Sequence, residues 1–132
     1  MTAQPILVVL AVSDVPRAVA FYRAAFGWSV VVDATVYVEL ETPGPFRVGL
    51  YARTGYAMNT GRPPVLVPPA EIAPFELYVR VDDLPGLVAS AVAAGARVLS
   101  PAAVRSWGDE VAYLADPDGN VLALAVPAAA TH

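Results

Sequence analysis

Apolar residues occur along this chain in short runs separated by acidic, proline-containing or glycine-containing segments. The run over residues 6–12 is rich in valine and leucine and ends at Ser13-Asp14, so we predict a buried strand. Ser13 or Asp14 would cap a helix of about 12 residues, which Gly27 would end. The apolar positions of this helix follow the spacing of one face: Val15, Val19, Tyr22 and Phe26.

The rest of the first half predicts three strands, at residues 28–32, 35–41 and 47–53. Residues 54–74 contain five prolines and two glycines, which predicts a linker with neither a helix nor a central strand. Its apolar segment, residues 65–67, is expected to pack against something, such as a second subunit.

The second half repeats this plan. A strand at residues 75–81 precedes a helix capped by Asp82 or Asp83 and ended by Gly95. Three more strands are predicted at residues 97–100, 110–115 and 120–126, with a tight turn at residues 116–119 and a loose tail at 127–132.

The two halves also share sequence. Val12-Ser13-Asp14-Val15-Pro16 recurs as Val81-Asp82-Asp83-Leu84-Pro85, and small residues further on match at the same offset. The sequence therefore predicts one α+β domain built from two β-α-β-β-β modules. Module one covers about residues 5–53, the linker 54–74 and module two 75–126.

Composition narrows the possible functions. Of 132 residues, 57% are hydrophobic and 15% charged, and this apolar surplus has to be buried in a core, a ligand cavity or a subunit interface. No apolar run approaches the roughly 20 residues that cross a bilayer, and the N-terminus lacks a basic leader. We therefore expect a cytoplasmic protein with no membrane partner.

Charge and cysteine content exclude further classes. The net charge is −4, from 12 acidic residues and 8 arginines, and no basic stripe is present, which argues against nucleic-acid binding. The chain has no cysteine, so disulfides and thiolate chemistry are excluded.

Two motifs, together with the module pattern, resemble a known superfamily. They are the segment at residues 12–22, with Gly27-Trp28 after it, and Ser106-Trp107-Gly108-Asp109-Glu110 ahead of Asp116-Pro117-Asp118-Gly119-Asn120. From Ile6 to Val126 the chain resembles the vicinal oxygen chelate superfamily of glyoxalase I, extradiol dioxygenases and bleomycin-resistance proteins, and most closely the bleomycin-resistance-like branch. The resemblance implies a cupped, eight-stranded mixed sheet whose concave face holds the site, and a homodimer.

The metal ligands of that superfamily map onto Leu7, Gly49, Glu76 and Ala123, to within one register step. Only Glu76 has a side chain that can ligate a cation, and the one histidine, His132, is at the C-terminus. We therefore expect no metal and no other cofactor. A misplaced register that brought in Glu39 or Glu110 would instead leave a metal-dependent enzyme.

Strand alternation predicts which side chains line the cup. The positions expected to face inward are Leu7, Val9, Arg47, Gly49, Tyr51, Glu76, Tyr78, Val121, Ala123 and Ala125. On the strand at 110–115, either Glu110, Ala112 and Leu114 or Val111 and Tyr113 face in. Gly49 and Ala123 are small, so we expect them to leave room for a ligand.

Glu76 is the strongest single candidate for a functional residue, because a carboxylate in an apolar strand is costly to bury without a partner. It is either a desolvated general base or ligand anchor, or a structural partner of Arg47 or another arginine, or a residue at a solvated strand end. Trp107, in a loop, is a candidate stacking platform, whereas Trp28 is expected in the core. The leading function is metal-free binding of a small, partly aromatic molecule such as an antibiotic or a metabolite. The alternative is a metal-independent isomerase- or lyase-like enzyme with Glu76 as its base.

Overall fold

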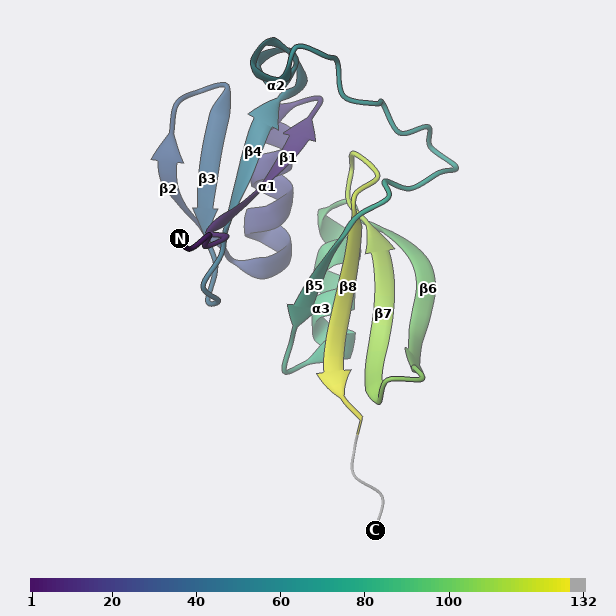
Figure 1. The fold of residues 1–132 in the computed structure, drawn as a ribbon. Helices are drawn as coiled ribbons and strands as arrows, with labels where there is room; N and C mark the ends of the chain where they lie inside the picture. The colour runs from purple at the N-terminus through teal and green to yellow at the C-terminus, as the bar shows by residue number, and fades with distance from the viewer. Residues whose placement is uncertain (129–132) are drawn as a thin grey trace. The chain divides into compact units, whose positions relative to one another are not determined.

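The computed structural model describes residues 1–128; residues 129–132, including His132 and most of the predicted tail, lie outside the described part. This part of the chain forms eight strands and three helices, which Figure 1 labels along the ribbon. They are β1 (Leu7–Val12), α1 (Val15–Phe26), β2 (Ser29–Asp33), β3 (Tyr37–Glu41), β4 (Arg47–Ala52), α2 (Arg53–Thr60), β5 (Glu76–Arg80), α3 (Leu84–Ala94), β6 (Arg97–Val104), β7 (Asp109–Ala115) and β8 (Val121–Pro127). The predicted α+β class and the two β-α-β-β-β modules are confirmed.

The chain forms two compact units. One comprises residues 1–23 and 27–66, and the other comprises residues 24–26 and the chain from 67 onward. Each unit has its own four-stranded mixed sheet, in the orders β1-β4-β3-β2 and β5-β8-β7-β6. In each sheet the first two strands named are parallel and the other neighbours are antiparallel.

The helices α1 and α3 begin where the sequence places them. Asp14 caps α1 by accepting a hydrogen bond from the backbone N–H of Arg17, and Asp83 caps α3 in the same way with Gly86. In both modules the second residue of the predicted pair, Asp14 or Asp83, is therefore the cap. A side chain at position 86 would overlap the Asp83 carboxylate, because its Cβ would lie 2.2 Å from an oxygen of that group.

The first sheet is buried on one face. The side chains on this face are Leu10, Val12, Val38, Leu40, Val48 and Leu50, each at most 4% exposed. The buried side of α1 carries Phe21 and Tyr22, and Trp28 stacks on the Tyr22 ring. Trp28 therefore belongs to the core, as predicted. Val19 and Phe26 are only half-buried, since the buried face of α1 is rotated toward Ala18 and Ala25.

The prediction that residues 54–74 contain no helix was wrong, because α2 occupies Arg53–Thr60. The prolines of this segment begin at Pro63 and so do not interrupt the helix. Gly55 has a packing role: a Cβ at this position would lie 2.5 Å from the Tyr51 ring. The glycine that weakens the helical pattern in the sequence is the residue that lets α2 pack on Tyr51.

The strand predicted at residues 97–100 was too short, because β6 continues to Val104 through Pro101. β6 is at the edge of its sheet, where a proline costs no ladder hydrogen bond if its nitrogen faces away from the neighbouring strand. The pairing of β6 with β7 shifts register between Val98 and Ser100 and again between Ser100 and Ala103.

The turn between β7 and β8 is organised by Asp116, which is buried. Its Oδ1 accepts hydrogen bonds from the backbone N–H groups of Asp118 and Asn120, and its Oδ2 accepts one from the Asn120 side chain. Asp116 therefore has the structural role in the turn that the sequence suggested.

Candidate functional site

The outer face of the first sheet, which is the face opposite the buried one, carries one polar cluster. The Tyr37 hydroxyl donates to Glu39 at 2.7 Å, and Arg47 donates to the other oxygen of the same carboxylate at 3.1 Å. The hydrogen bond from Tyr37 and the nearby Arg47 guanidinium lower the pKa of Glu39, whereas burial and the Glu39 charge raise the pKa of Tyr37 well above its usual range. Glu39 and Arg47 therefore neutralise each other.

Gly49 and Ala123 were expected to leave room for a guest, and this prediction was wrong. A Cβ at Gly49 would lie 2.8 Å from the Tyr37 hydroxyl oxygen, so the phenol already fills the space above the glycine. Ala123 is fully buried in a small cluster with Val111 and Ala125, against which Tyr113 packs. In both modules an aromatic side chain from the neighbouring strand covers the small residue.

The register places the other first-module candidates on the same face as this cluster. Leu7, Val9 and Ala11 of β1 pair with Arg47, Gly49 and Tyr51 of β4. The ring of Tyr51 makes edge contacts with Tyr37 and Tyr56, and its hydroxyl accepts a hydrogen bond from Asn59 at 2.9 Å. Tyr51 is thus held by α2 as part of a packed aromatic group.

In the second module, Tyr78 and Trp107 belong to a second polar cluster. The Trp107 indole donates to the Tyr78 hydroxyl at 2.9 Å, and this hydroxyl donates to Asp109. Arg80 forms an ion pair with the same carboxylate at 3.4 Å. The hydrogen bond from Tyr78 and the Arg80 guanidinium lower the pKa of Asp109. The cluster fixes the orientation of the exposed Trp107 side chain.

The second module also contains an open cavity of about 570 Å³. Its lining comes from the segment before β5 and from β5, β6, β7 and β8, all within this module: Ile72, Ala73, Pro74, Phe75, Glu76, Leu99, Ser100, Tyr113 and Val121. Most of these side chains are apolar, and the volume lies in the range that small-molecule sites occupy.

Among the candidates from the sequence, the lining includes Glu76, Val121 and Tyr113. The premise of a desolvated Glu76 was wrong, because the side chain is exposed at the start of β5. Within residues 1–128 the Glu76 carboxylate forms no ion pair or hydrogen bond. The alternative of a pair with Arg47 was wrong as well, since Arg47 is bonded to Glu39. The remaining alternative, a solvated strand end, agrees with the exposed position of Glu76 at the start of β5.

The register also decides the orientation of β7. Tyr113 pairs with Ala123 and Val111 with Ala125, so these two side chains share the face of Tyr78 and Ala123. Glu110, one residue out of phase, lies on the opposite face and does not join the other candidate ligand-binding residues.

Comparison with known proteins gives the family. The model of the glyoxalase-like domain family matches residues 7–125, which is nearly the whole described chain. The chain belongs to this family. Its membership places the chain in the vicinal oxygen chelate superfamily, as the sequence motifs predicted. Among curated proteins no match to the chain was found.

Several solved structures share the fold. A glyoxalase-related enzyme from Fulvimarina pelagi superposes with a TM-score of 0.82 at 23% identity, covering 94% of this chain and 88% of that one. A glyoxalase/bleomycin resistance protein/dioxygenase family enzyme from Burkholderia phytofirmans PsJN has a TM-score of 0.78 at 24% identity, over 93% and 98%. TioX from a Micromonospora species has a TM-score of 0.68 at 22% identity, over 93% and 98%.

The metal that the superfamily implies does not fit the residues of this glyoxalase-like chain. At the four mapped positions stand Leu7, Gly49, Glu76 and Ala123, of which Glu76 alone offers an oxygen ligand. Residues 1–128 contain no group of three or more histidine, cysteine, aspartate or glutamate side chains placed to hold an ion. In the same range, none of the helices is long and apolar enough to cross a membrane.

Sequence reasoning missed the partners of the candidate residues. Nothing in the local sequence joins Tyr37 to Gly49 or Asp109 to Tyr78, because these pairs are formed across neighbouring or next-nearest strands. Arg105 was also missed: its guanidinium lies 5.1 Å from the centre of the Tyr113 ring and bonds to Ser100, and both of these residues line the cavity. A lone arginine two residues before Trp107 was the one available signal.

Proposed function

We propose that this glyoxalase-like protein binds a small, largely apolar molecule that carries a positively charged group, in the cavity of the second module and without a bound metal. One observation carries the proposal. The Glu76 carboxylate stands in the wall of an otherwise mostly apolar cavity and has no cation to pair with within residues 1–128.

The residues that line the cavity indicate what each would contribute to binding. Apolar side chains such as Phe75, Leu99 and Val121 would contribute affinity by removing apolar surface from water. Glu76 would select for a cation and orient it, since a charge-assisted hydrogen bond is stronger than a neutral one. The net charge of −4 favours the approach of a cationic ligand. Sequestration of an antibiotic or a metabolite is the role that this arrangement suits.

The experiment compares benzylamine with benzyl alcohol, which have the same ring but differ in charge, by NMR titration of the labelled protein. We expect benzylamine to bind more tightly, and Glu76→Gln to weaken its binding by about tenfold while leaving benzyl alcohol unaffected. Glu71→Gln is the matched control, because Glu71 is exposed nearby and does not line the cavity. Equal affinities for the two probes, or equal effects of the two substitutions, would refute the proposal.

The same substitution tests the enzymatic alternative. The Tyr113 hydroxyl also has no hydrogen-bond partner within residues 1–128, so a phenol and a carboxylate without partners both line the cavity. If Glu76 is a general base, Glu76→Gln abolishes turnover of the substrate and leaves its affinity mostly intact. A sequestering protein loses affinity instead.

We also propose that the protein is a homodimer. Val65 and Leu66, in the segment after α2, are 83% and 65% exposed, and Met58 and Ile72 are exposed as well. A second copy would cover such side chains. A monomeric mass by light scattering at micromolar concentration would contradict this proposal.

A further inference from the structure

Arg105 follows β6 directly and is held by neutral oxygen atoms. Its Nη2 donates to the Ser100 hydroxyl at 3.1 Å and to the carbonyl oxygens of Pro101 and Val111 at 3.0 and 2.9 Å. Its guanidinium also lies over the ring of Tyr113. These contacts fix the guanidinium against the paired strands β6 and β7, beside Ser100 and Tyr113.

The charge of Arg105 is not neutralised within residues 1–128. Arg47 and Arg80 each form an ion pair, with Glu39 and Asp109, whereas no carboxylate lies within ion-pair distance of Arg105. Its Nε is buried and meets no acceptor, and its Nη1 has no hydrogen bond and is not buried. A half-buried guanidinium normally has a partner, because removing an unpaired charge from water is costly.

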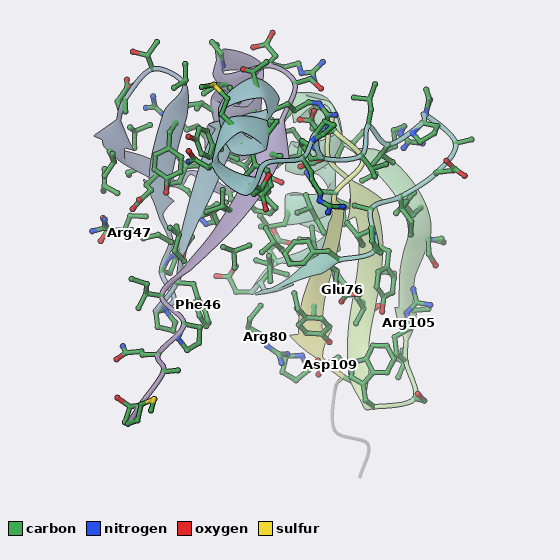
Figure 2. All side chains as sticks on the ribbon, turned by 45° about the horizontal axis from the view of Figure 1, so that its top comes forward. Phe46, Arg47, Glu76, Arg80, Arg105 and Asp109 are labelled. Carbon is green, nitrogen blue, oxygen red and sulfur yellow. The ribbon has the colours of Figure 1, made fainter. Side chains whose placement is uncertain are left out.

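Arg105 does not itself line the cavity but borders it through two residues that do. Ser100 and Tyr113, which Arg105 contacts, both line the cavity, and Glu76 lines it from β5. The sheet order β5-β8-β7-β6 puts Glu76 on one edge strand and Arg105 next to the other. Tyr113 is on β7, two strand spacings or about 10 Å from β5. Figure 2 labels both Glu76 and Arg105 on this module.

We propose that the ligand of this cavity is a zwitterion, with an anionic oxygen group that pairs with Arg105 Nη1 and a cationic group that pairs with Glu76. The inference rests on the proposed function and specifies its ligand class. The opposite charges lie at the two ends of a short apolar body, because the carboxylate and the guanidinium approach from opposite edges of the sheet and the lining between them is mostly apolar. Molecules with a carboxylate, sulfonate or phosphate opposite an amine fit this description.

The test adds two probes to benzylamine: benzoate, which has only the anionic group, and 4-(aminomethyl)benzoate, which has both groups at opposite ends of one ring. We expect the zwitterion to bind about tenfold more tightly than benzylamine. Arg105→Gln removes this advantage and leaves the affinity for benzylamine unchanged, and Arg105→Lys restores part of it. A merely structural role would weaken binding of all the probes alike.

Arg97→Gln is the matched control, because Arg97 is an exposed arginine at the start of β6, has no ion pair within residues 1–128 and does not line the cavity. The inference is overturned if the zwitterion binds no better than benzylamine, or if its advantage survives Arg105→Gln. If Arg105→Gln does not fold, Arg105→Lys takes its place: a zwitterion advantage that is unchanged in Arg105→Lys overturns the inference, and one that is reduced supports it. Failure of the proposed function would look different. The affinity for benzylamine would then be the same in the unaltered protein and in Glu76→Gln, independently of the result for Arg105→Gln.

Discussion

Replacement of Gly49 by alanine tests the packing that closes the outer face of the first sheet. The new methyl group would lie 2.8 Å from the Tyr37 hydroxyl oxygen and 3.0 Å from a ring carbon, closer than van der Waals contact allows. The ring has little freedom to move away, because its hydroxyl is bonded to Glu39 and its edge contacts Tyr51. Overpacking of this kind costs about 1–3 kcal/mol, so we expect Gly49→Ala to lower the free energy of unfolding by that amount.

The assay is equilibrium unfolding in urea, with Tyr37→Ala as the second arm of a double-mutant cycle. Without the phenol, Gly49→Ala should stabilise the protein by about 0.5 kcal/mol, because alanine is better than glycine inside a strand. Gly44→Ala is the control: its Cβ would meet nothing closer than 3.8 Å. If Gly49→Ala costs the same with and without Tyr37, the phenol does not fill this space and the reasoning is refuted.

Two further predictions concern protonation. Because Tyr37 and Arg47 hold the pKa of Glu39 below its ordinary value of about 4.3, Glu39 stabilises the fold above that pH and loses this effect as the pH falls through its folded pKa. The difference in unfolding free energy between the protein and Glu39→Gln should therefore shrink below about pH 4, and a constant difference from pH 7 to 3 would contradict the assignment. Tyr78→Phe removes the main cause of the lowered pKa of Asp109, so the Asp109 carboxyl should titrate at higher pH in this variant. NMR follows this titration, and an unchanged midpoint would show that the Tyr78 hydroxyl does not bond to Asp109.

The fold could be predicted from the sequence because its signals are local. A strand, an acidic cap and a helix-ending glycine occur in order in both halves, and the two caps are residues that the sequence names, Asp14 and Asp83. The errors arose where tertiary contacts outweigh local propensity. Gly55 weakens a helix on its own but is required for the contact of α2 with Tyr51, and Pro101 is compatible with β6 because β6 is an edge strand.

The candidate site was predictable only in part. Alternation placed Glu76 and Tyr78 on the same face correctly, since side chains two residues apart on a strand share a face. It did not show that Tyr37 covers Gly49, nor that Glu76 is exposed instead of buried. Those facts depend on the length and partners of side chains on other strands, which periodicity along one strand does not contain.

The proline and the two register shifts of β6 also bear on how the protein behaves when it is concentrated. An open strand edge is a template onto which another polypeptide can add by backbone hydrogen bonding. Pro101 has no N–H to offer, and the irregular pairing on either side of Ser100 interrupts the even row of donors and acceptors that an incoming strand would need. The edge that carries the exposed Val98, Leu99 and Val104 is therefore poorly suited to growth into fibrous assemblies.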